Sequence, residues 1–393
     1  MVNEPTGRNV GVAPSEMAQL AKLLMRLGAD IDLIARTSGQ YKETIRYRYK
    51  EKILGRGFAL QARLNFQGLG MQRIVMKVKM GAAYASYTKE LFMAMNKLCY
   101  VTSFSALMPE EFYLVHANVP KEFKDKFVEV MTKLRELGIF ASIDFYSFDR
   151  FRNVPMRAEY YDFEHGLWEF DWGAPIEHPR EGSEDGFEAF TFDKLDLLIM
   201  KELQADATRS LREICDAIRS NDGMDINYKT LAWHWTRHVQ EKRMINGYAL
   251  RWMGTRYDPV ADAVKRKPHK YIFITTLVRR VNESERLALT AEMNKVPFIW
   301  SEAAGEDYYA QFAFPVETLN DAFSFLKTVM SRFGDRAEYH VIDQMNSLSF
   351  TLTYQLYDDV ERRWTFNSEE ALMRFQSLIM KIGESSGVGR NAG

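Results

Sequence analysis

The sequence lacks the features that mark secreted, membrane-bound or disulfide-stabilised proteins. Among its 393 residues only Cys99 and Cys215 are cysteines, so one chain can form neither a disulfide framework nor a four-cysteine zinc site. No apolar run is long enough to span a bilayer, and the polar residues 1–12 do not read as a secretory signal. We therefore expect a cytoplasmic protein that has no membrane partner.

Catalytic signatures are also missing. The sequence contains no P-loop, no Gly-x-Gly-x-x-Gly fingerprint and no nucleophile elbow. His234 and His238 are four residues apart, a spacing that can hold a metal ion, but the sequence shows no third ligand beside them. Asp193 and Asp196 stand at a predicted helix start, where helix capping accounts for them. These absences predict a protein that is not an enzyme and that needs neither a metal nor a cofactor.

What the sequence does contain is an internal duplication. Residues 51–60 read EKILGRGFAL and residues 241–250 read EKRMINGYAL, so the charged pair and the Gly-aromatic-Ala-Leu end recur 190 residues apart. In both copies a helix-forming stretch rich in Lys, Arg and aromatic residues meets a glycine and then a β-prone segment. A winged helix-turn-helix passes from its recognition helix to its wing in this order. The duplication therefore predicts two DNA-binding heads in one chain.

The segments after the two copies repeat one order of elements. Strands are predicted by their Ile and Val content, and the second helix of each copy is bounded by a proline and a glycine, Pro120 with Gly138 and Pro315 with Gly334. In the first copy, strands are predicted at residues 71–80, 99–107, 110–120 and 139–146, with helices at 84–98 and before Gly138. In the second copy, strands are predicted at residues 271–278, 298–304, 307–315 and 337–342, with helices at 282–296 and 317–333. The order β-α-β-β-α-β is that of a ferredoxin-like domain. The predicted fold class is α+β, with two tandem repeats of a winged helix-turn-helix and a ferredoxin-like βαββαβ domain.

The net charge of −1 conceals a segregated distribution of charge. Residues 40–80 carry ten Lys and Arg against two acids, whereas residues 158–188 carry ten acids against one Arg. A basic segment in a neutral chain can attract phosphate locally, although a solvated charged face is the alternative interpretation. The acidic segment also contains Gly, Pro and Ser, which is typical of a linker.

In the first head, helices are predicted near residues 15–28, 30–37 and 41–54, followed by a wing at residues 58–65 with Arg63 near its tip. Arg side chains match guanine edges, and Lys and Tyr reach the phosphates. The residues expected to bind DNA in this head are Lys42, Thr44, Arg46, Tyr47, Arg48, Lys50, Arg56 and Arg63.

The recognition helix of the second head is predicted over residues 227–243. Trp233 and Trp235 are bulky for a DNA groove, and we expect them to pack against the wing or the partner repeat. The residues expected to bind DNA in this head are Lys229, Thr230, His234, Arg237, His238 and Lys242.

Two segments of the second repeat resemble a known family. Residues 192–214, FDKLDLLIMKELQADATRSLREI, closely resemble the helix-turn-helix entry of the Lrp/AsnC feast/famine regulators, and residues 305–309, GEDYY, resemble the family's Gly-x-x-Asp-Tyr strand start. The resemblance implies a winged helix-turn-helix, a ferredoxin-like assembly domain and a homodimer. It also implies an amino-acid effector bound beside Gly305, Asp307 and Tyr308.

The chain departs from the family pattern in three ways. The first repeat lacks the Asp-x-x-Asp entry and has PEEFY at residues 109–113 in place of GEDYY. Residues 220–225 look like an insertion before the second recognition helix, and a family member normally has one repeat per chain. These departures bear more on effector sensing than on DNA binding, because both basic helices are present.

We expect a cytoplasmic, nucleoid-associated transcription regulator that binds double-stranded DNA through both heads. The alternatives are an architectural chromatin protein and an amino-acid sensing module without sequence-specific DNA binding. An apolar stripe at residues 368–382 is expected to pack on its own repeat or on a second subunit. The predicted domains are residues 1–66 (first head), 67–157 (first ferredoxin-like domain), 158–189 (acidic linker), 190–262 (second head), 263–360 (second ferredoxin-like domain) and 361–393 (C-terminal helix and tail).

Overall fold

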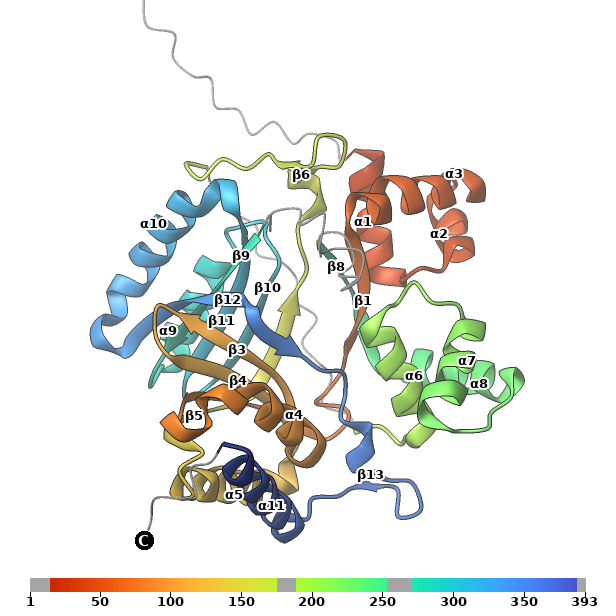
Figure 1. Ribbon diagram of the computed structural model, residues 1–393. Coiled ribbons are helices and arrows are strands. Elements are labelled where there is room, and N and C mark those ends of the chain that lie inside the picture. Colours follow the sequence, from red (N-terminus) through yellow and green to blue (C-terminus); the bar gives the residue numbers. More distant parts are fainter. Residues whose placement is uncertain (1–14, 175–188, 253–270, 387–393) are drawn as a thin grey trace, which may run out of the picture.

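The structure is a computed structural model that describes residues 15–174, 189–252 and 271–386. It confirms the predicted α+β fold with two tandem repeats, each a helical head followed by an α+β unit. The two heads lie next to each other on one side of the molecule (Figure 1). The first head comprises α1 (Glu16–Leu27), α2 (Ile31–Ser38) and α3 (Lys42–Tyr47) with a π-helical extension (Arg48–Ile53), and the second comprises α6 (Lys194–Ala205), α7 (Leu211–Asp222) and α8 (Tyr228–His234) with a π-helical extension (Trp235–Gln240).

The helix boundaries of the second head follow from capping residues. Asp193 caps α6 in a capping box with Asp196, and Ser210 caps α7 in a capping box with Glu213. Gly223 ends α7 in the left-handed conformation, with a φ of 66°, which glycine adopts at little cost. Among the described residues, no helix combines the length and the apolar character needed to cross a bilayer.

Each α+β unit has the predicted order of elements, with small shifts at the boundaries. The first contains β2 (Met71–Met80), α4 (Thr88–Cys99), β3 (Val101–Met108), β4 (Phe112–Pro120), α5 (Lys124–Glu136) and β5 (Phe140–Val154). The second contains β9 (Tyr271–Val278), α9 (Glu283–Met293), β10 (Trp300–Gly305), β11 (Tyr308–Pro315), α10 (Leu319–Met330) and β12 (Ala337–Ser349). The largest differences from prediction are at β5 and β12, which both extend well beyond their expected ends.

These two long strands join the sheets of the two repeats. One part of β5 pairs with β2 and the other with β10, while β12 pairs in the same way with β9 and then with β3. The result is a closed barrel in the order β10-β11-β9-β12-β3-β4-β2-β5, in which neither sheet keeps a free edge. In Figure 1, α9 and α10 lie beside the sheet of the second repeat, and α4 and α5 lie beside that of the first. A separate apolar cluster, which includes Val75, Tyr146 and Tyr309, fills part of the barrel interior.

The strands that follow the two heads pair with each other. β1 (Phe58–Leu64) runs antiparallel to β8 (Ile245–Trp252), and Leu60 is paired with Leu250, the residue at the same place in the other copy of the decapeptide. Pairing of equivalent residues indicates a two-fold axis through this ribbon, so one chain contains an arrangement that homodimers build from two. Arg63, predicted near a wing tip, instead donates hydrogen bonds to the backbone carbonyls of Asn153 (2.8 Å) and Asn246 (3.2 Å). A homodimer of whole chains stays a prediction.

The segment after each barrel strand crosses to the other repeat. After β5, the hairpin of β6 (Tyr161–Asp162) and β7 (Leu167–Trp168) contacts Phe58 of the first head and Phe298 of the second repeat. Part of the predicted acidic linker is therefore folded, and its residues 175–188 lie outside the described residues.

The corresponding segment after β12 crosses in the opposite direction. It contains the hairpin of β13 (Tyr357–Asp358) and β14 (Arg363–Trp364), which packs on Tyr100 of the first repeat, and then α11 (Ser368–Ser386). α11 packs against α5 and α4, so the expectation that it packs on its own repeat is wrong. Because β12 crosses to β3 before α11 begins, α11 lies next to the helices of the first repeat, and the sheet of the second repeat is farther away.

Candidate functional site

The cations of the first recognition helix lie beside carboxylates of the same head. Lys42 pairs with Asp32 (2.5 Å), Arg46 with Glu43 (2.5 Å), and Arg48 with Glu16. Glu16 of α1 and Asp32 of α2 precede residues 40–80, the segment whose sequence carries the excess of positive charge. Among the other predicted DNA-binding residues, Thr44 is half-buried, whereas Tyr47, Lys50 and Arg56 are exposed. The head therefore carries less uncompensated positive charge than its sequence predicts.

In the second head the predicted residues divide into two groups. Lys229 and Thr230 are exposed at the start of α8, while Arg237 pairs with Glu241 and the Lys242 ammonium donates to the Thr191 carbonyl. His234 and His238 instead face the protein interior, and the Nδ1 of each lies within hydrogen-bond distance of the buried Asp196 carboxylate, at 2.9 and 2.8 Å. Burial lowers the pKa of His234, but the hydrogen bond to Asp196 and the charge of Asp193 shift it upward overall.

The predicted effector residues form the turn between β10 and β11. The Gly305 N–H donates to the Asp307 carbonyl (2.9 Å), and an Asp307 side-chain oxygen accepts from the backbone N–H of Arg280 (3.0 Å). Tyr308 is fully buried in the core of the second repeat. None of the three lines the pocket described next, and an amino-acid effector beside them stays a prediction.

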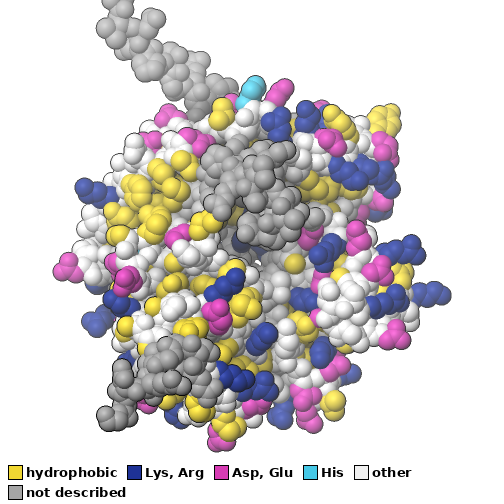
Figure 2. Space-filling model, viewed as in Figure 1, with side chains coloured by type: hydrophobic (Ala, Val, Ile, Leu, Met, Phe, Trp, Pro, Cys, Tyr) yellow, Lys and Arg dark blue, Asp and Glu magenta, His cyan; other side chains and the backbone are white. Residues whose placement is uncertain are grey.

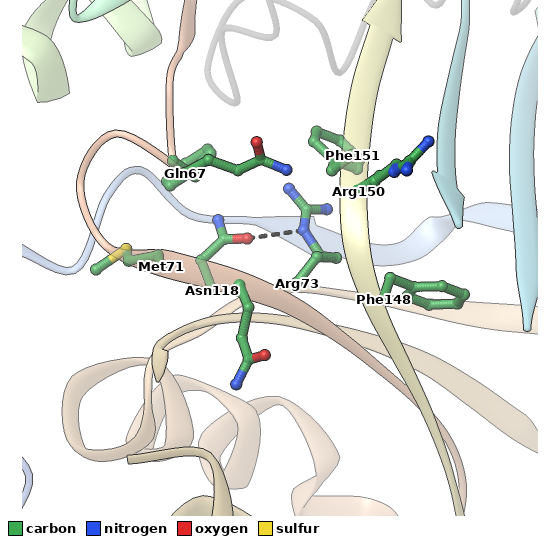
Figure 3. A pocket seen from close by; sticks show the side chains of 9 residues that line it. Gln67, Met71, Arg73, Asn118, Phe148, Arg150 and Phe151 are labelled. Atoms are coloured by element: carbon green, nitrogen blue, oxygen red, sulfur yellow. Dashed lines mark hydrogen bonds between the residues drawn. The ribbon is translucent and has the colours of Figure 1, made fainter. Parts of the chain in front are cut away.

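A pocket opens at the end of the barrel where β1 leads into β2. It has about 270 Å³ of space, partly open to solvent, and is lined by Phe66, Gln67, Met71, Gln72, Arg73, Asn118, Phe148, Arg150 and Phe151. Arg73 is fixed at its centre: its Nε donates to the Asn118 side-chain oxygen (2.7 Å), and its guanidinium lies 4.0 Å from the ring centroid of Phe151 (Figure 3). Arg150 supplies a second guanidinium to the lining.

A chain of buried polar groups lies close to Arg73 in the barrel interior. The Ser103 hydroxyl is 2.9 Å from His116 Nδ1, and His116 Nε2 is 3.0 Å from the Tyr309 hydroxyl. Burial, with a further contribution from the charge of Arg73, lowers the pKa of His116 to about 3, so the imidazole is neutral at neutral pH. Burial also raises the pKa of Tyr309, which keeps its hydroxyl protonated. These groups join β3 and β4 of the first repeat to β11 of the second.

A second polar network lies further along β2. Lys77, largely buried, pairs with Glu338 (2.8 Å) and Glu110 (3.4 Å), and its Nζ is 3.3 Å from His340 Nε2. Hydrogen bonds from His340 and Lys77 lower the pKa of Glu338 to about 2 despite its partial burial. Glu110 belongs to the PEEFY segment, so this departure from the family pattern provides a partner for a barrel lysine.

Sequence reasoning missed Arg73 and His116 as site residues. Arg73 and Lys77 alternate with Val75 along one face of β2, and that face is directed into the barrel. The alternation was visible in the sequence, but the two cations were counted as part of a DNA-binding basic segment. A charged residue on the same side of a strand as buried apolar residues indicates a polar site inside the barrel, whereas a charged residue on the opposite side indicates a surface in contact with solvent.

Comparison with known proteins gives matches only among solved structures, because no family model and no curated protein matches the chain. The siroheme decarboxylase NirDL, in complex with an iron-uroporphyrin III analogue, matches with a TM-score of 0.50 and 10% identity over 93% of this chain and 98% of that chain. AsnC of E. coli (TM-score 0.25, 18% identity) covers 33% of this chain with 87% of its own, and MtbAldR (TM-score 0.23, 14% identity) covers 34% with 92%. At 10% identity, the match to NirDL is a similarity of fold alone.

The full-length match corrects the expectation that this protein is not an enzyme. The siroheme decarboxylase NirDL, whose fold matches 93% of this chain, is an enzyme, so this fold is compatible with catalysis. The absence of familiar catalytic motifs from the sequence was therefore a poor guide, because those motifs belong to other folds.

Proposed function

We propose that this protein is an enzyme that binds a carboxylate-bearing tetrapyrrole at the barrel pocket and removes carboxyl groups from its side chains. The observation that carries the proposal is Arg73, a guanidinium held by Asn118 and Phe151 at the centre of an aromatic-lined pocket. A guanidinium fixed in this way is suited to bind a carboxylate, because its planar fork matches the two oxygens. The shared fold with a siroheme decarboxylase directs the proposal to tetrapyrroles.

The size and lining of the pocket determine which part of such a substrate it takes. The pocket is shallow and open to solvent, so it can take the end of one acidic side chain while the macrocycle stays outside it. Phe66 and Phe151, both partly exposed, offer apolar surface to the ring, while Arg73 and Arg150 offer positive charge to its carboxylates. In Figure 3 the Arg73 side chain lies between Gln67, Asn118 and Phe151.

The buried polar chain provides the proton that the reaction needs. When a carboxylate leaves as carbon dioxide, the electron pair of the broken carbon–carbon bond stays on the side-chain carbon, which then takes up a proton. We assign the Tyr309 hydroxyl as the proton donor, because burial keeps it protonated. The neutral imidazole of His116 then acts as a relay: its Nε2–H returns a proton to the Tyr309 oxygen, 3.0 Å away, while its Nδ1 takes one from the Ser103 hydroxyl at 2.9 Å. Ser103 is only partly buried and regains its proton from solvent.

The proposal predicts that Arg73→Gln weakens tetrapyrrole binding. Loss of a charge-assisted hydrogen bond costs about 1.5–3 kcal/mol, which corresponds to a Kd roughly 10- to 150-fold higher. Binding is measured by titrating the full chain with iron-uroporphyrin III and recording the change of the Soret absorbance. Carboxyl removal is followed by the mass of the tetrapyrrole after incubation, with Tyr309→Phe expected to bind the ligand and lose turnover.

Arg374→Gln is the matched control, because Arg374 is an exposed arginine of α11 that pairs only with Glu370 of the same helix among the described contacts. Its Kd should equal that of the unaltered protein. If the unaltered protein does not bind the tetrapyrrole, or if Arg73→Gln binds it equally well, the proposed function is wrong.

Duplex DNA is a second candidate ligand, favoured by the exposure of recognition-helix residues on both heads. Tyr47 and Trp233 are 58% and 53% exposed, and Lys50 and Lys229 lie on the same two helices. Because Lys42, Arg46 and Arg48 are paired with carboxylates, we propose that only a few phosphates are contacted by each head.

We therefore expect DNA affinity to fall with salt, and Lys50→Ala and Lys229→Ala each to reduce the salt slope by about one phosphate contact. Fluorescence anisotropy of a labelled duplex at several salt concentrations measures this slope. Lys97→Ala, an exposed lysine of α4 in the α+β unit, is the control and should leave the slope unchanged. Binding that does not respond to salt would remove DNA from consideration.

A further inference from the structure

Two aspartates and two histidines converge within the second head. Asp193 and Asp196 belong to the start of α6, and His234 and His238 to α8 and its π-helical extension. One ligand atom from each of the four side chains can be chosen such that all lie within 4.8 Å of one another. Two imidazoles and two carboxylates at this separation are a donor set of the kind that binds transition metals.

Local structure explains how the four side chains meet. Asp193 is the N-cap of α6 and Asp196 the third residue of its capping box, so both carboxylates are held at one helix end. The two histidines are four residues apart where α8 passes into its π-helical turn, so they project from one side with ring centroids 4.8 Å apart. Asp196 is 38 residues from His234 and 42 from His238 in sequence, so residue spacing alone shows no third ligand beside the histidines.

The cluster holds two carboxylates beside two imidazoles, and Asp196 also accepts a hydrogen bond from the backbone N–H of Asp193 (3.1 Å). The Asp196 side chain is fully buried, with one oxygen 2.9 Å from His234 Nδ1 and the other 2.8 Å from His238 Nδ1. Asp193 adds a second carboxylate 3.6 Å from His234 Nδ1. A buried carboxylate is costly unless a cation or several hydrogen bonds compensate it. The neighbouring ammonium of Lys242 is directed to the Thr191 carbonyl.

We propose that Asp193, Asp196, His234 and His238 form a binding site for a divalent transition-metal ion of the zinc type. Bonds of about 2.0–2.2 Å in a tetrahedron place ligand atoms roughly 3.3–3.6 Å apart. The three His-to-Asp separations of 2.8, 2.9 and 3.6 Å are close to this range, and the widest separation in the cluster, within 4.8 Å, closes when the side chains rotate toward the ion. The ion replaces the imidazole-to-carboxylate hydrogen bonds, and its two positive charges balance the two carboxylates. Paired imidazole ligands select zinc, cobalt or nickel over magnesium and calcium.

A bound ion would tie the recognition helix of the second head to α6. The two helices would then be joined by coordination bonds as well as by apolar contacts, which restricts the head to one arrangement. Trp233 packs on both imidazole rings, with centroids 5.1 and 4.7 Å away, and covers this side of the site. While they bind the ion, His234 and His238 cannot contact DNA. The metal site is in the second head, so this proposal does not depend on which substrate binds at the barrel.

The test uses the untagged full chain after chelator treatment and removal of the chelator. Titration with Zn²⁺ in a calorimeter should give a site of one ion per chain, and Co²⁺ should give the strong visible absorption typical of tetrahedral coordination. Asp193→Ser keeps an N-cap hydroxyl while it removes one ligand, and His238→Gln removes another. Each variant is expected to bind Zn²⁺ at least tenfold more weakly, with its near-ultraviolet circular dichroism unchanged.

His165→Gln provides the matched control. His165 is an exposed histidine that also pairs with an aspartate, Asp162, in the hairpin of β6 and β7, so this variant tests whether any Asp-His pair suffices. It should bind Zn²⁺ as the unaltered protein does. Absence of Zn²⁺ binding, or equal affinity in the folded His238→Gln variant, would show that the four residues are a hydrogen-bonded structural cluster only.

Discussion

Glu302→Gln is expected to lower the free energy of unfolding by about 3–5 kcal/mol, because it leaves the buried guanidinium of Arg152 without its counter-charge. Glu302 lies on β10 and Arg152 on β5, with side chains 7% and 15% exposed, and their ion pair crosses the seam at which the two repeats close the barrel. The same carboxylate accepts a hydrogen bond from Thr290 of α9. Urea unfolding followed by circular dichroism and by tryptophan fluorescence measures the loss.

Glu370→Gln is the control for this experiment. Glu370 pairs with Arg374 one turn away on the solvent-facing side of α11, where an ion pair contributes about 0.3–0.5 kcal/mol. Its removal should therefore change the unfolding free energy little. Comparable losses in the two variants would mean that the seam pair is no more important to the barrel than a surface pair.

Trp364→Ala is also expected to cost about 3–5 kcal/mol, the range found when a large buried aromatic side chain is truncated. Trp364 is 5% exposed, and its indole N–H donates to the Leu69 carbonyl (3.0 Å) across the two repeats. Its ring packs against Tyr100 of the first repeat and Phe192 of the second head. The substitution therefore leaves a cavity and an unpaired carbonyl where the C-terminal segment crosses the molecule.

Trp233→Ala serves as the comparison, because Trp233 is 53% exposed on the recognition helix of the second head. Its truncation is expected to change global stability by less than about 1 kcal/mol. Both variants are measured by urea unfolding under identical conditions. If Trp364→Ala unfolds at the same urea concentration as the unaltered protein, the crossing segment does not contribute to the stability of the barrel.

The sequence was sufficient to predict the local structure and its duplication. The repeated decapeptide identified two equivalent halves, and capping residues such as Asp193 located the helix ends. The order of strands and helices in both α+β units follows from periodicity and from the bounding residues Pro120 and Pro315, which act over a few neighbouring residues. These features depend on short-range interactions, which a sequence displays directly.

Only the tertiary structure decided how the halves combine and which side chains meet. The ends of β5 and β12 pair with the other repeat, so their length depends on partners more than a hundred residues away in sequence. The same closure directs Arg73 and His116 into the barrel, whereas helix packing in the second head turns His234 toward Asp196 and away from solvent. Burial and charge pairing between distant segments determine these positions, and residue spacing along the chain does not contain that information.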